Sequence, residues 1–264
     1  MTEDRRCSEM DARTALACLD LTRLNDDDDA AAITALVARA AGPAGMPAAL
    51  CVWPRWVALA RRTLPSTVRV AAVANFPAGG TDAAAAVAEA QAIVAAGGDE
   101  IDLVLPWRAL QGGDAAAASA VVLAVRQACP AHTLKLIIES GELATPALIR
   151  QACAIGLDAG VDFLKTSTGK TGSGATPQAA RLMLQSIAGH ARGATVGFKA
   201  SGGIRTLADA AVYLLLVREI LGPSALAPQR LRFGASGLLS DIEAVLAGQG
   251  AGAGAGSAAA PGSY

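Results

Sequence analysis

The four lysines are the residues of this 264-residue chain whose type and spacing point most directly to chemistry. The chain has 22 basic residues, so the other 18 (22 minus 4) are arginines, and the lysines fall within one 65-residue stretch: Lys135, Lys165, Lys170 and Lys199. A crowded or buried lysine amine can lose its proton and become a nucleophile, whereas a guanidinium stays charged. The pattern favours amine chemistry in this stretch. The alternative is an arginine-biased composition with four lysines left by chance.

The elements that must position these lysines alternate regularly along the chain. The expected strands are residues 15–20, 48–52, 69–75, 100–105, 134–139, 162–165, 195–201 and 231–234. The expected helices are residues 27–41, 54–64, 81–96, 114–128, 145–159, 177–188, 207–221 and 238–246. Such alternation predicts parallel strands, and eight units in this length predict an α/β fold, the (β/α)8 TIM barrel. An open doubly wound sheet is the alternative.

A single domain with two extensions is expected. Residues 1–14 form an N-terminal extension, residues 15–247 the barrel, and residues 248–264 a flexible Gly/Ala-rich tail that ends in Tyr264. The acidic run at 26–29 is expected to cap the first barrel helix. A metal site there is disfavoured, because adjacent carboxylates at a helix start fan around its axis.

Composition argues against several classes of function. Net charge is −1 with no basic block, which disfavours nucleic acid as a partner. The charged N-terminus and interrupted apolar stretches predict no signal peptide and no membrane span. Five scattered cysteines without a C-x-x-C pair indicate a reducing cytoplasm. The two histidines, His132 and His190, lie too far apart to suggest a zinc site or a histidine-based catalytic site, so neither metal nor cofactor is expected.

The active site is expected where the barrel strands end. The polar residues at or near those ends are Asp20, Cys51, Asn75, Asp102, Lys135, Glu139, Lys165, Lys199 and Ser236. Three of these are lysines on successive strands, so their side chains should converge on one pocket. Cys51 is expected to serve packing, although a thiol near the site could react with an aldehyde.

Buried charges must be paired or neutralised, and Asp20 and Asp102 can pair with only two of these three lysines. The third, desolvated beside another cation, would have a lowered pKa. A fall from about 10.4 to about 7 requires roughly 4–5 kcal/mol of differential stabilisation. A neutral amine would suit Schiff-base formation. A purely structural ion-pair network is the alternative, and the residues alone do not choose between Lys165 and Lys199.

Glycine-rich loops after the last strands suit an anion. The Gly-Lys-Thr triplet at 169–171 is not a P-loop, because Leu164 stands where a glycine is required. Glycines at 202–203 and 237 expose backbone N–H groups in the two loops that usually bind phosphate in such barrels. Lys170 could add a point charge. The alternative is that these glycines only form tight turns.

With these motifs in order, the chain resembles the deoxyribose-phosphate aldolase family of class I aldolases. The matching stretches are LDLT at 19–22, CVWP at 51–54, NFP at 75–77, EID at 100–102, LKLIIE at 134–139, FLKTSTGK at 163–170, FKASGGIR at 198–205 and FGAS at 233–236. The resemblance implies reversible, metal-independent cleavage of 2-deoxy-D-ribose 5-phosphate to acetaldehyde and D-glyceraldehyde 3-phosphate in deoxynucleoside catabolism. A homodimer is a further expectation. Another short sugar phosphate as substrate, or a barrel that only binds one, remain alternatives.

The resemblance also assigns roles. Lys165 is the Schiff-base nucleophile, Lys199 the neighbour that perturbs it and exchanges protons, and Asp102 the acid/base that works through a bound water. Asp20 and Lys135 form a supporting relay. The implied phosphate-site residues are Thr168, Gly169, Lys170, Gly202, Gly203, Ser236 and Gly237.

Two departures from the family pattern concern the C-terminal part of the chain. One branch of the family has Ser-Ser where this chain has Ser236-Gly237, so one hydroxyl contact to phosphate is lost. The tail has Ala-Gly repeats in place of a polar linker, yet it ends in Tyr264, as in the branch whose C-terminal tyrosine enters the site. A flexible 17-residue tail has an r.m.s. span of about 20–24 Å, enough to reach the barrel mouth. A terminal tyrosine present by chance is the alternative.

Deletion of Tyr264 tests this reading of the tail. We expect turnover to slow more than substrate binding weakens, because the tyrosine would assist proton transfer rather than hold substrate. Steady-state kinetics of the shortened and full-length chains provide the measurement, and identical kinetics would contradict the prediction.

Overall fold

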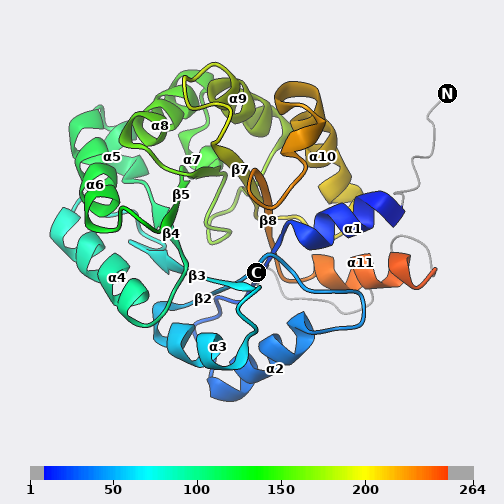
Figure 1. Ribbon diagram of the computed structural model, residues 1–264. Coiled ribbons are helices and arrows are strands. Elements are labelled where there is room, and N and C mark those ends of the chain that lie inside the picture. The colour runs from blue at the N-terminus through cyan, green and yellow to red at the C-terminus, as the bar shows by residue number, and fades with distance from the viewer. Residues whose placement is uncertain (1–8, 249–264) are drawn as a thin grey trace.

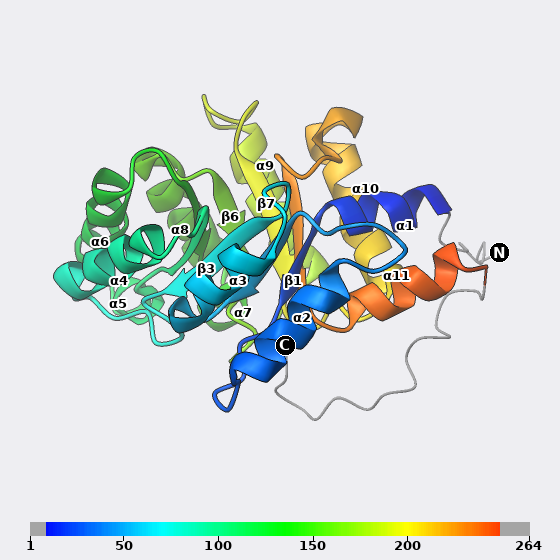
Figure 2. The same cartoon turned by 60° about the horizontal axis from the view of Figure 1, so that its bottom comes forward.

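The computed structural model describes residues 9–248, which form a closed barrel of eight parallel strands inside a ring of helices (Figures 1 and 2). The strands pair in sequence order, and β8 closes the barrel on β1. Their bounds are β1 (Leu19–Thr22), β2 (Ala49–Val52), β3 (Arg69–Ala74), β4 (Glu100–Val104), β5 (Thr133–Ile137), β6 (Phe163–Lys165), β7 (Gly197–Ser201) and β8 (Leu231–Ala235). The expected (β/α)8 TIM barrel is confirmed, and the open sheet is wrong because β1 and β8 are paired.

All eight expected helices are present, with small shifts at their ends. The helices between and after the strands are α2 (Ala30–Ala40), α3 (Val57–Thr63, preceded by the 3-10 turn Pro54–Trp56), α4 (Ala83–Ala95), α6 (Ala115–Ala128), α8 (Pro146–Ala159), α9 (Pro177–Ala188), α10 (Leu207–Leu221) and α11 (Leu238–Leu246). Short elements that the sequence did not predict are α5 (Trp107–Gln111), α7 (Ser140–Leu143) and a 3-10 turn at Pro223–Ala225. In Figure 2, α3 lies in front of β3, with which it is in contact.

The first expected strand is wrong at its start. Residues 15–17 belong to α1 (Glu9–Ala17), and β1 begins only at Leu19. Ala12, Ala15 and Leu16 are buried, a helical spacing that packs one face of α1. The helix lies beside α10 and α11 (Figure 1). Residues 9–14, expected as part of an extension, are therefore packed against the barrel helices, and the expected boundary at residue 15 falls inside α1.

Helix ends follow the capping signals in the sequence. The Asp29 carboxylate accepts the N–H of Ala32 at the start of α2, so the expected role of the acidic run is confirmed for this residue. Gly160 ends α8 with a φ of 84°, a left-handed conformation that glycine adopts without strain. These capping contacts determine where α2 begins and where α8 ends.

The barrel interior is divided into two walls. On β2 and β3 the interior side chains form a small apolar cluster of Cys51, Ala71 and Val73, joined by Leu24. The remaining strands turn charged side chains inward, while the main hydrophobic core fills the space between strands and helices. A polar site can therefore exist inside the barrel without weakening the outer core.

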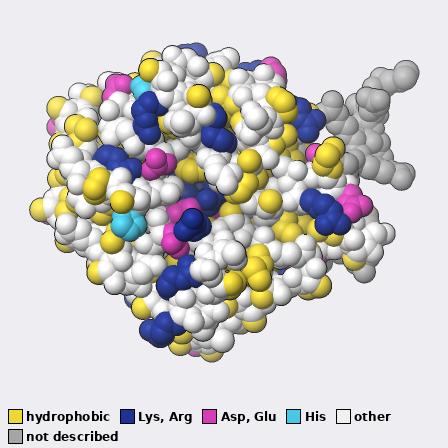
Figure 3. All heavy atoms as spheres, viewed as in Figure 1, with side chains coloured by type: hydrophobic (Ala, Val, Ile, Leu, Met, Phe, Trp, Pro, Cys, Tyr) yellow, Lys and Arg dark blue, Asp and Glu magenta, His cyan; other side chains and the backbone are white. Residues whose placement is uncertain are grey.

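Carboxylates just before β4 and β6 pair with arginines of α3, β3 and α6. Asp99, just before β4, pairs with Arg61 and Arg69, and Asp162, just before β6, pairs with Arg126. Figure 3, in the same view as Figure 1, shows basic and acidic side chains gathered near the middle of the visible face.

Within residues 9–248, no helix combines the length and apolar character needed to cross a membrane.

Two glycine-to-alanine variants test the packing at the N-terminal ends of β6 and β7. A Cβ at Gly197 would lie 2.2 Å from Cε1 of the buried Phe163 ring, so Gly197→Ala should destabilise the fold by about 1–3 kcal/mol through overpacking. Gly172→Ala is the matched control, since no atom lies within 4 Å of its added Cβ. Urea unfolding measures both variants, and equal stabilities would contradict the prediction.

Candidate active site

Seven buried ionisable side chains meet inside the barrel. They are Asp20 on β1, Glu100 and Asp102 on β4, Lys135 on β5, Lys165 on β6, Lys199 on β7 and Arg232 on β8. The register places Asp102 beside Lys135 and Lys165 beside Lys199, so side chains in register point to the same side of the sheet. The structure thus brings together the three strand lysines and both aspartates that the sequence had placed there.

Asp102 is the hub of this network. Its Oδ1 accepts a hydrogen bond from Lys135 Nζ at 2.8 Å, and its Oδ2 accepts from Lys165 Nζ at 2.9 Å and Lys199 Nζ at 2.7 Å. Burial alone would raise the pKa of Asp102, but the three ammonium groups outweigh burial and hold that pKa well below its usual range. Asp102 is therefore a carboxylate near neutral pH.

Asp20 is the second acceptor and ties β1 to β7 and β8. Its Oδ2 lies 2.5 Å from Lys199 Nζ, and its Oδ1 lies 2.6 Å from Arg232 Nη1. Burial raises the pKa of Asp20, but Lys199, Arg232 and Lys135 together lower it below its ordinary value. Lys199 thus lies between two carboxylates.

Lys135 is held as a cation. Its Nζ lies 2.6 Å from Glu100 Oε2, 2.8 Å from Asp102 Oδ1 and 3.5 Å from Asp20 Oδ2. Burial would lower the pKa of Lys135, but Asp102, Glu100 and Asp20 together raise it above its usual value. Of the three strand lysines, Lys135 is therefore the least suited to act as a neutral nucleophile.

Lys165 has the fewest carboxylate contacts. Over residues 9–248 its only ion pair is with Asp102 Oδ2, and it shares that oxygen with Lys199. Lys199 has a second partner in Asp20, so its charge is better compensated. Among the three strand lysines, Lys165 is therefore the one whose charge has the fewest carboxylate partners in the described part of the chain.

Cys51 lies where the apolar wall meets this network. Its Sγ is 3.9 Å from Asp102 Oδ2, and it packs in the cluster with Ala71 and Val73. Burial first, and then the nearby Asp102 carboxylate, raise the pKa of the Cys51 thiol. The side chain is therefore a neutral thiol near pH 7, in keeping with the expected packing role.

The segment after β6 is fixed by Glu139, which follows β5. The Thr168 hydroxyl donates to Glu139 Oε2 at 2.6 Å, and the Thr168 N–H also points to this carboxylate. Glu139 itself has a φ of 52°, an uncommon left-handed conformation for a residue that is not glycine. Burial raises the pKa of Glu139. Thr168, expected at the phosphate site, is thus buried with its hydroxyl already occupied, and it orders the loop that carries Gly169 and Lys170.

Lys170 projects to the opposite side of the barrel mouth. Its Nζ donates to the backbone carbonyl of Leu24, after β1, at 2.7 Å. The side chain is half-buried, as is Gly169, whose φ is 73°. The amine therefore lies at the mouth of the barrel and outside the network around Asp102.

The loops after β7 and β8 offer backbone N–H groups at the same end. Gly202 and Gly203 both have a left-handed φ, of 85° and 84°, so this turn requires glycine. Ser236 and Gly237 are exposed just before α11, whose N-terminus has no side-chain cap. Uncapped N–H groups at a helix start favour an anion.

A buried carboxylate joins the two helices that follow these loops. Asp241 in α11 accepts the N–H of Leu207, the first residue of α10, at 2.6 Å. The start of α10 is also closed by a reciprocal pair in which Thr206 and Asp209 cap each other's backbone. The start of α10 is therefore capped by side chains, whereas the start of α11 has no side-chain cap.

Some residues expected near the site lie elsewhere. The Asn75 side chain bonds to Gly80 and Val104 and fixes the loop after β3. His190, which was not expected in the site, lies 3.4 Å from the exposed Asp158. Tyr264 and the tail from residue 249 onward lie outside the described residues.

Sequence reasoning missed Glu100 and Arg232. Glu100 lies two residues before Asp102 on β4, and Arg232 lies two residues before Gly234 on β8. The two-residue period of a strand turns Glu100 to the same interior face as Asp102, which was the available signal. Gly234, expected at the end of the last strand, has a packing role that the sequence did not indicate: a Cβ there would lie 2.9 Å from Ser201 Cβ and 3.1 Å from Lys199 Cε, so glycine makes room for these side chains.

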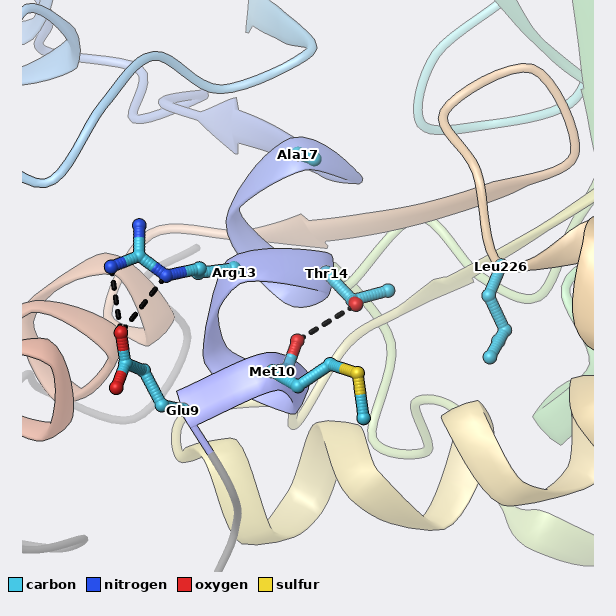
Figure 4. Close-up of a pocket in the computed structure, with 6 residues that line it drawn as sticks. All are labelled: Glu9, Met10, Arg13, Thr14, Ala17 and Leu226. Atoms are coloured by element: carbon cyan, nitrogen blue, oxygen red, sulfur yellow. Dashed lines mark hydrogen bonds and ion pairs between the residues drawn. The ribbon is translucent and has the colours of Figure 1, made fainter.

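The open pocket in Figure 4 is not this site. It has a volume of about 570 Å³ and is lined by Glu9, Met10, Arg13, Thr14, Ala17 and Leu226. Helix α1 precedes β1 and Leu226 precedes β8, so the pocket lies at the N-terminal end of the barrel, whereas the lysine network leads toward the C-terminal ends of the strands. Among residues 9–248, no three His, Cys, Asp or Glu side chains form a group suited to a metal ion.

Comparison with known proteins agrees with this arrangement. The sequence profile of the DeoC/LacD family aldolases matches residues 14–220. A curated deoxyribose-phosphate aldolase from Agrobacterium fabrum is 47% identical over 240 residues, which cover 90% of this chain and 92% of that protein.

Solved structures give the same result for the fold. A Coccidioides immitis protein, provisionally described as a deoxyribose-phosphate aldolase, is 29% identical with a TM-score of 0.76, covering 88% of this chain and 87% of its own. A Toxoplasma gondii protein with a similar provisional description is 22% identical, has a TM-score of 0.82 and covers 91% and 96% of the two chains, which shows the shared fold alone. Because the family profile and a relative at 47% identity each span most of the barrel, this chain belongs to the DeoC/LacD family of aldolases.

Proposed function

We propose that this aldolase reversibly cleaves 2-deoxy-D-ribose 5-phosphate to acetaldehyde and D-glyceraldehyde 3-phosphate through an imine on Lys165, in deoxynucleoside catabolism. The observation that carries the proposal is the shared Asp102 oxygen: Lys165 and Lys199 both depend on it, and only Lys199 has a second carboxylate. The curated relative at 47% identity supports the choice of substrate.

The reaction begins with attack of the neutral Lys165 amine on the C1 aldehyde of the open-chain sugar. The carbinolamine loses water to give an iminium ion, whose positive nitrogen accepts electrons when the C2–C3 bond breaks. The C3 hydroxyl loses its proton in this step, and C3 to C5 leave as D-glyceraldehyde 3-phosphate. The enamine that remains is protonated at C2, and hydrolysis of the resulting imine frees acetaldehyde and the lysine.

The surrounding groups fit the proton transfers that this sequence needs. Asp102 is ionised because its pKa is held low, so it can accept a proton, through a water, from a hydroxyl of substrate or carbinolamine. The iminium ion keeps the positive charge at Lys165 beside Asp102 until the bond cleavage, which neutralises the nitrogen as the enamine forms. Lys199 is the proton donor beside it, and Asp20 with Lys135 orients both groups.

The phosphate is assigned to the mouth of the barrel. The N–H groups at Gly202, Gly203 and Gly237, the Ser236 hydroxyl and the Lys170 amine all come from loops after β6, β7 and β8. Thr168 supports this site through its bond to Glu139 rather than through a free hydroxyl. A dianion there would be stabilised by the uncapped start of α11 and by the lysine charge.

Trapping of the imine tests the assignment of the nucleophile. Acetaldehyde with borohydride should leave an ethyl group on the peptide that contains Lys165, because a reduced imine is a stable secondary amine. Lys165→Met should abolish this adduct and lower kcat by more than about 1000-fold. Mass spectrometry of digested protein gives the readout. Lys170→Met is the matched control, and in this variant the adduct on Lys165 should persist. An adduct on Lys199 would overturn the assignment.

Comparison of substrates with and without the 5-phosphate tests the anion site. Lys170→Met should lower kcat/KM for 2-deoxy-D-ribose 5-phosphate by about 10-fold or more, because one hydrogen bond to a charged group is lost. The same variant should change kcat/KM for 2-deoxy-D-ribose much less. A coupled dehydrogenase assay follows both reactions. An equal loss for the two substrates would place Lys170 outside phosphate recognition.

A further inference from the structure

An ion pair near the N-terminal ends of β4 and β8 belongs to the lysine network but is not used by the mechanism above. Arg232 Nη1 and Nη2 lie 3.1 and 2.8 Å from the two carboxylate oxygens of Glu100, and both side chains are buried. Arg232 also donates to Asp20 at 2.6 Å, and Glu100 also accepts Lys135 at 2.6 Å. The pair therefore contacts both Asp20 and Lys135, the two residues that support Lys199 and Asp102.

The position of the Arg232 guanidinium is fixed from several sides. Its Nε donates to the Pro228 carbonyl at 2.5 Å, and its Cζ lies 5.5 Å from the centre of the Phe163 ring. Burial would lower the pKa of Arg232, but Asp20 and Glu100 raise it above its usual value. The side chain is thus a permanent positive charge. It touches neither Lys165 nor the mouth of the barrel, so it is not placed to contact substrate.

The contacting network carries more positive than negative groups. Its cations are Lys135, Lys165, Lys199 and Arg232, and its carboxylates are Asp20, Glu100 and Asp102, which leaves four charges against three when every group is ionised. Arg232 and Lys135 are held as cations by their carboxylates. The excess positive charge therefore falls on the part of the network with the fewest carboxylate contacts, which is Lys165.

We propose that Arg232, clamped by Glu100, is a positioning residue that favours the neutral amine of Lys165 and holds Asp20 in place for Lys199. This inference rests on the function proposed above, since it concerns the amine that forms the imine. Arg232 acts in two ways. Its charge disfavours a further cation in the network, and its bond to Asp20 Oδ1 leaves Oδ2 directed at Lys199.

Other ionisable groups around Lys165 do not change this sign. Those facing it from neighbouring elements are Asp20, Cys51, Glu100, Asp102, Lys135, Glu139, Lys199 and Arg232. Cys51 stays a thiol. Glu139 is bound by Thr168 and Thr171 and makes no ion-pair contact with Lys165, although the charge of Lys165 lowers the pKa of Glu139. Apart from Glu100 and Arg232, these groups are unaltered in the variants below, so their contributions cancel when variants are compared.

The test is a set of charge variants read by the pH profile of kcat/KM. Arg232→Gln removes a positive charge, so the acid limb should move to higher pH by about one pH unit. Glu100→Gln removes a negative charge and should move the limb to lower pH. The double variant Arg232→Gln with Glu100→Gln restores the charge balance and should return the limb close to that of the unaltered enzyme.

Arg232→Lys is the conservative control. It keeps the charge but loses the forked bond to Glu100, so it should lower thermal stability while leaving the acid limb within a few tenths of a pH unit. A purely structural role for Arg232 would lower activity at every pH without moving the limb, and that outcome would overturn the inference. Shifts of the two single variants in the same direction would also overturn it.

A second readout separates this inference from the proposed function. Cyanate carbamoylates neutral amines, so the pH dependence of labelling at the Lys165 peptide follows its protonation without any catalysis. If the unaltered protein fails to cleave deoxyribose 5-phosphate, the proposed function is wrong, yet opposite labelling shifts in Arg232→Gln and Glu100→Gln would still support the charge coupling. If cleavage occurs and labelling is unshifted in both variants, the inference alone is wrong.

Discussion

One buried carboxylate, Asp102, accepts hydrogen bonds from three lysines, and the polar half of the barrel depends on it. A buried ammonium without a partner would be very costly, so Lys135, Lys165 and Lys199 can share one interior because Asp102 receives all three, while Asp20 and Glu100 receive two of them again. The sharing is unequal. Lys135 and Lys199 have further carboxylates, whereas Lys165 relies on an oxygen that another lysine also occupies. The same carboxylate contacts thus hold Lys135 and Lys199 in place and leave Lys165 with the fewest partners.

The backbone makes room for so many long side chains in a narrow barrel. Gly197 leaves space for the Phe163 ring, and Gly234 leaves space for the stem of Lys199. On the opposite wall, Ala71 and Cys51 are small, and the Cys51 thiol is the point at which this wall meets Asp102. The two walls therefore fit together: long charged side chains from six strands fill the barrel interior, and small side chains on β2 and β3 leave space for them.

Much of this could be predicted from the sequence, because strands have a simple period. Alternation and the order of apolar segments were enough to place Lys165 and Lys199 on neighbouring strands with Asp102 facing them. The contact between Arg232 and Glu100 could not be predicted, because it depends on how far a long side chain reaches across the barrel. The error at residues 15–17 has a different cause: a short apolar run fits a buried helix face as well as a strand, and only packing against α10 and α11 decides.

The bond from Lys170 to the Leu24 carbonyl has a consequence for affinity. A free lysine side chain on a surface carries about 2 kcal/mol of rotamer entropy, which a ligand must overcome if it orders that chain on binding. Here the chain is already ordered in the free protein by a neutral acceptor from across the mouth. The entropic cost is met during folding, so an anion that exchanges with the carbonyl encounters a preorganised charge and keeps more of the electrostatic energy as net binding free energy.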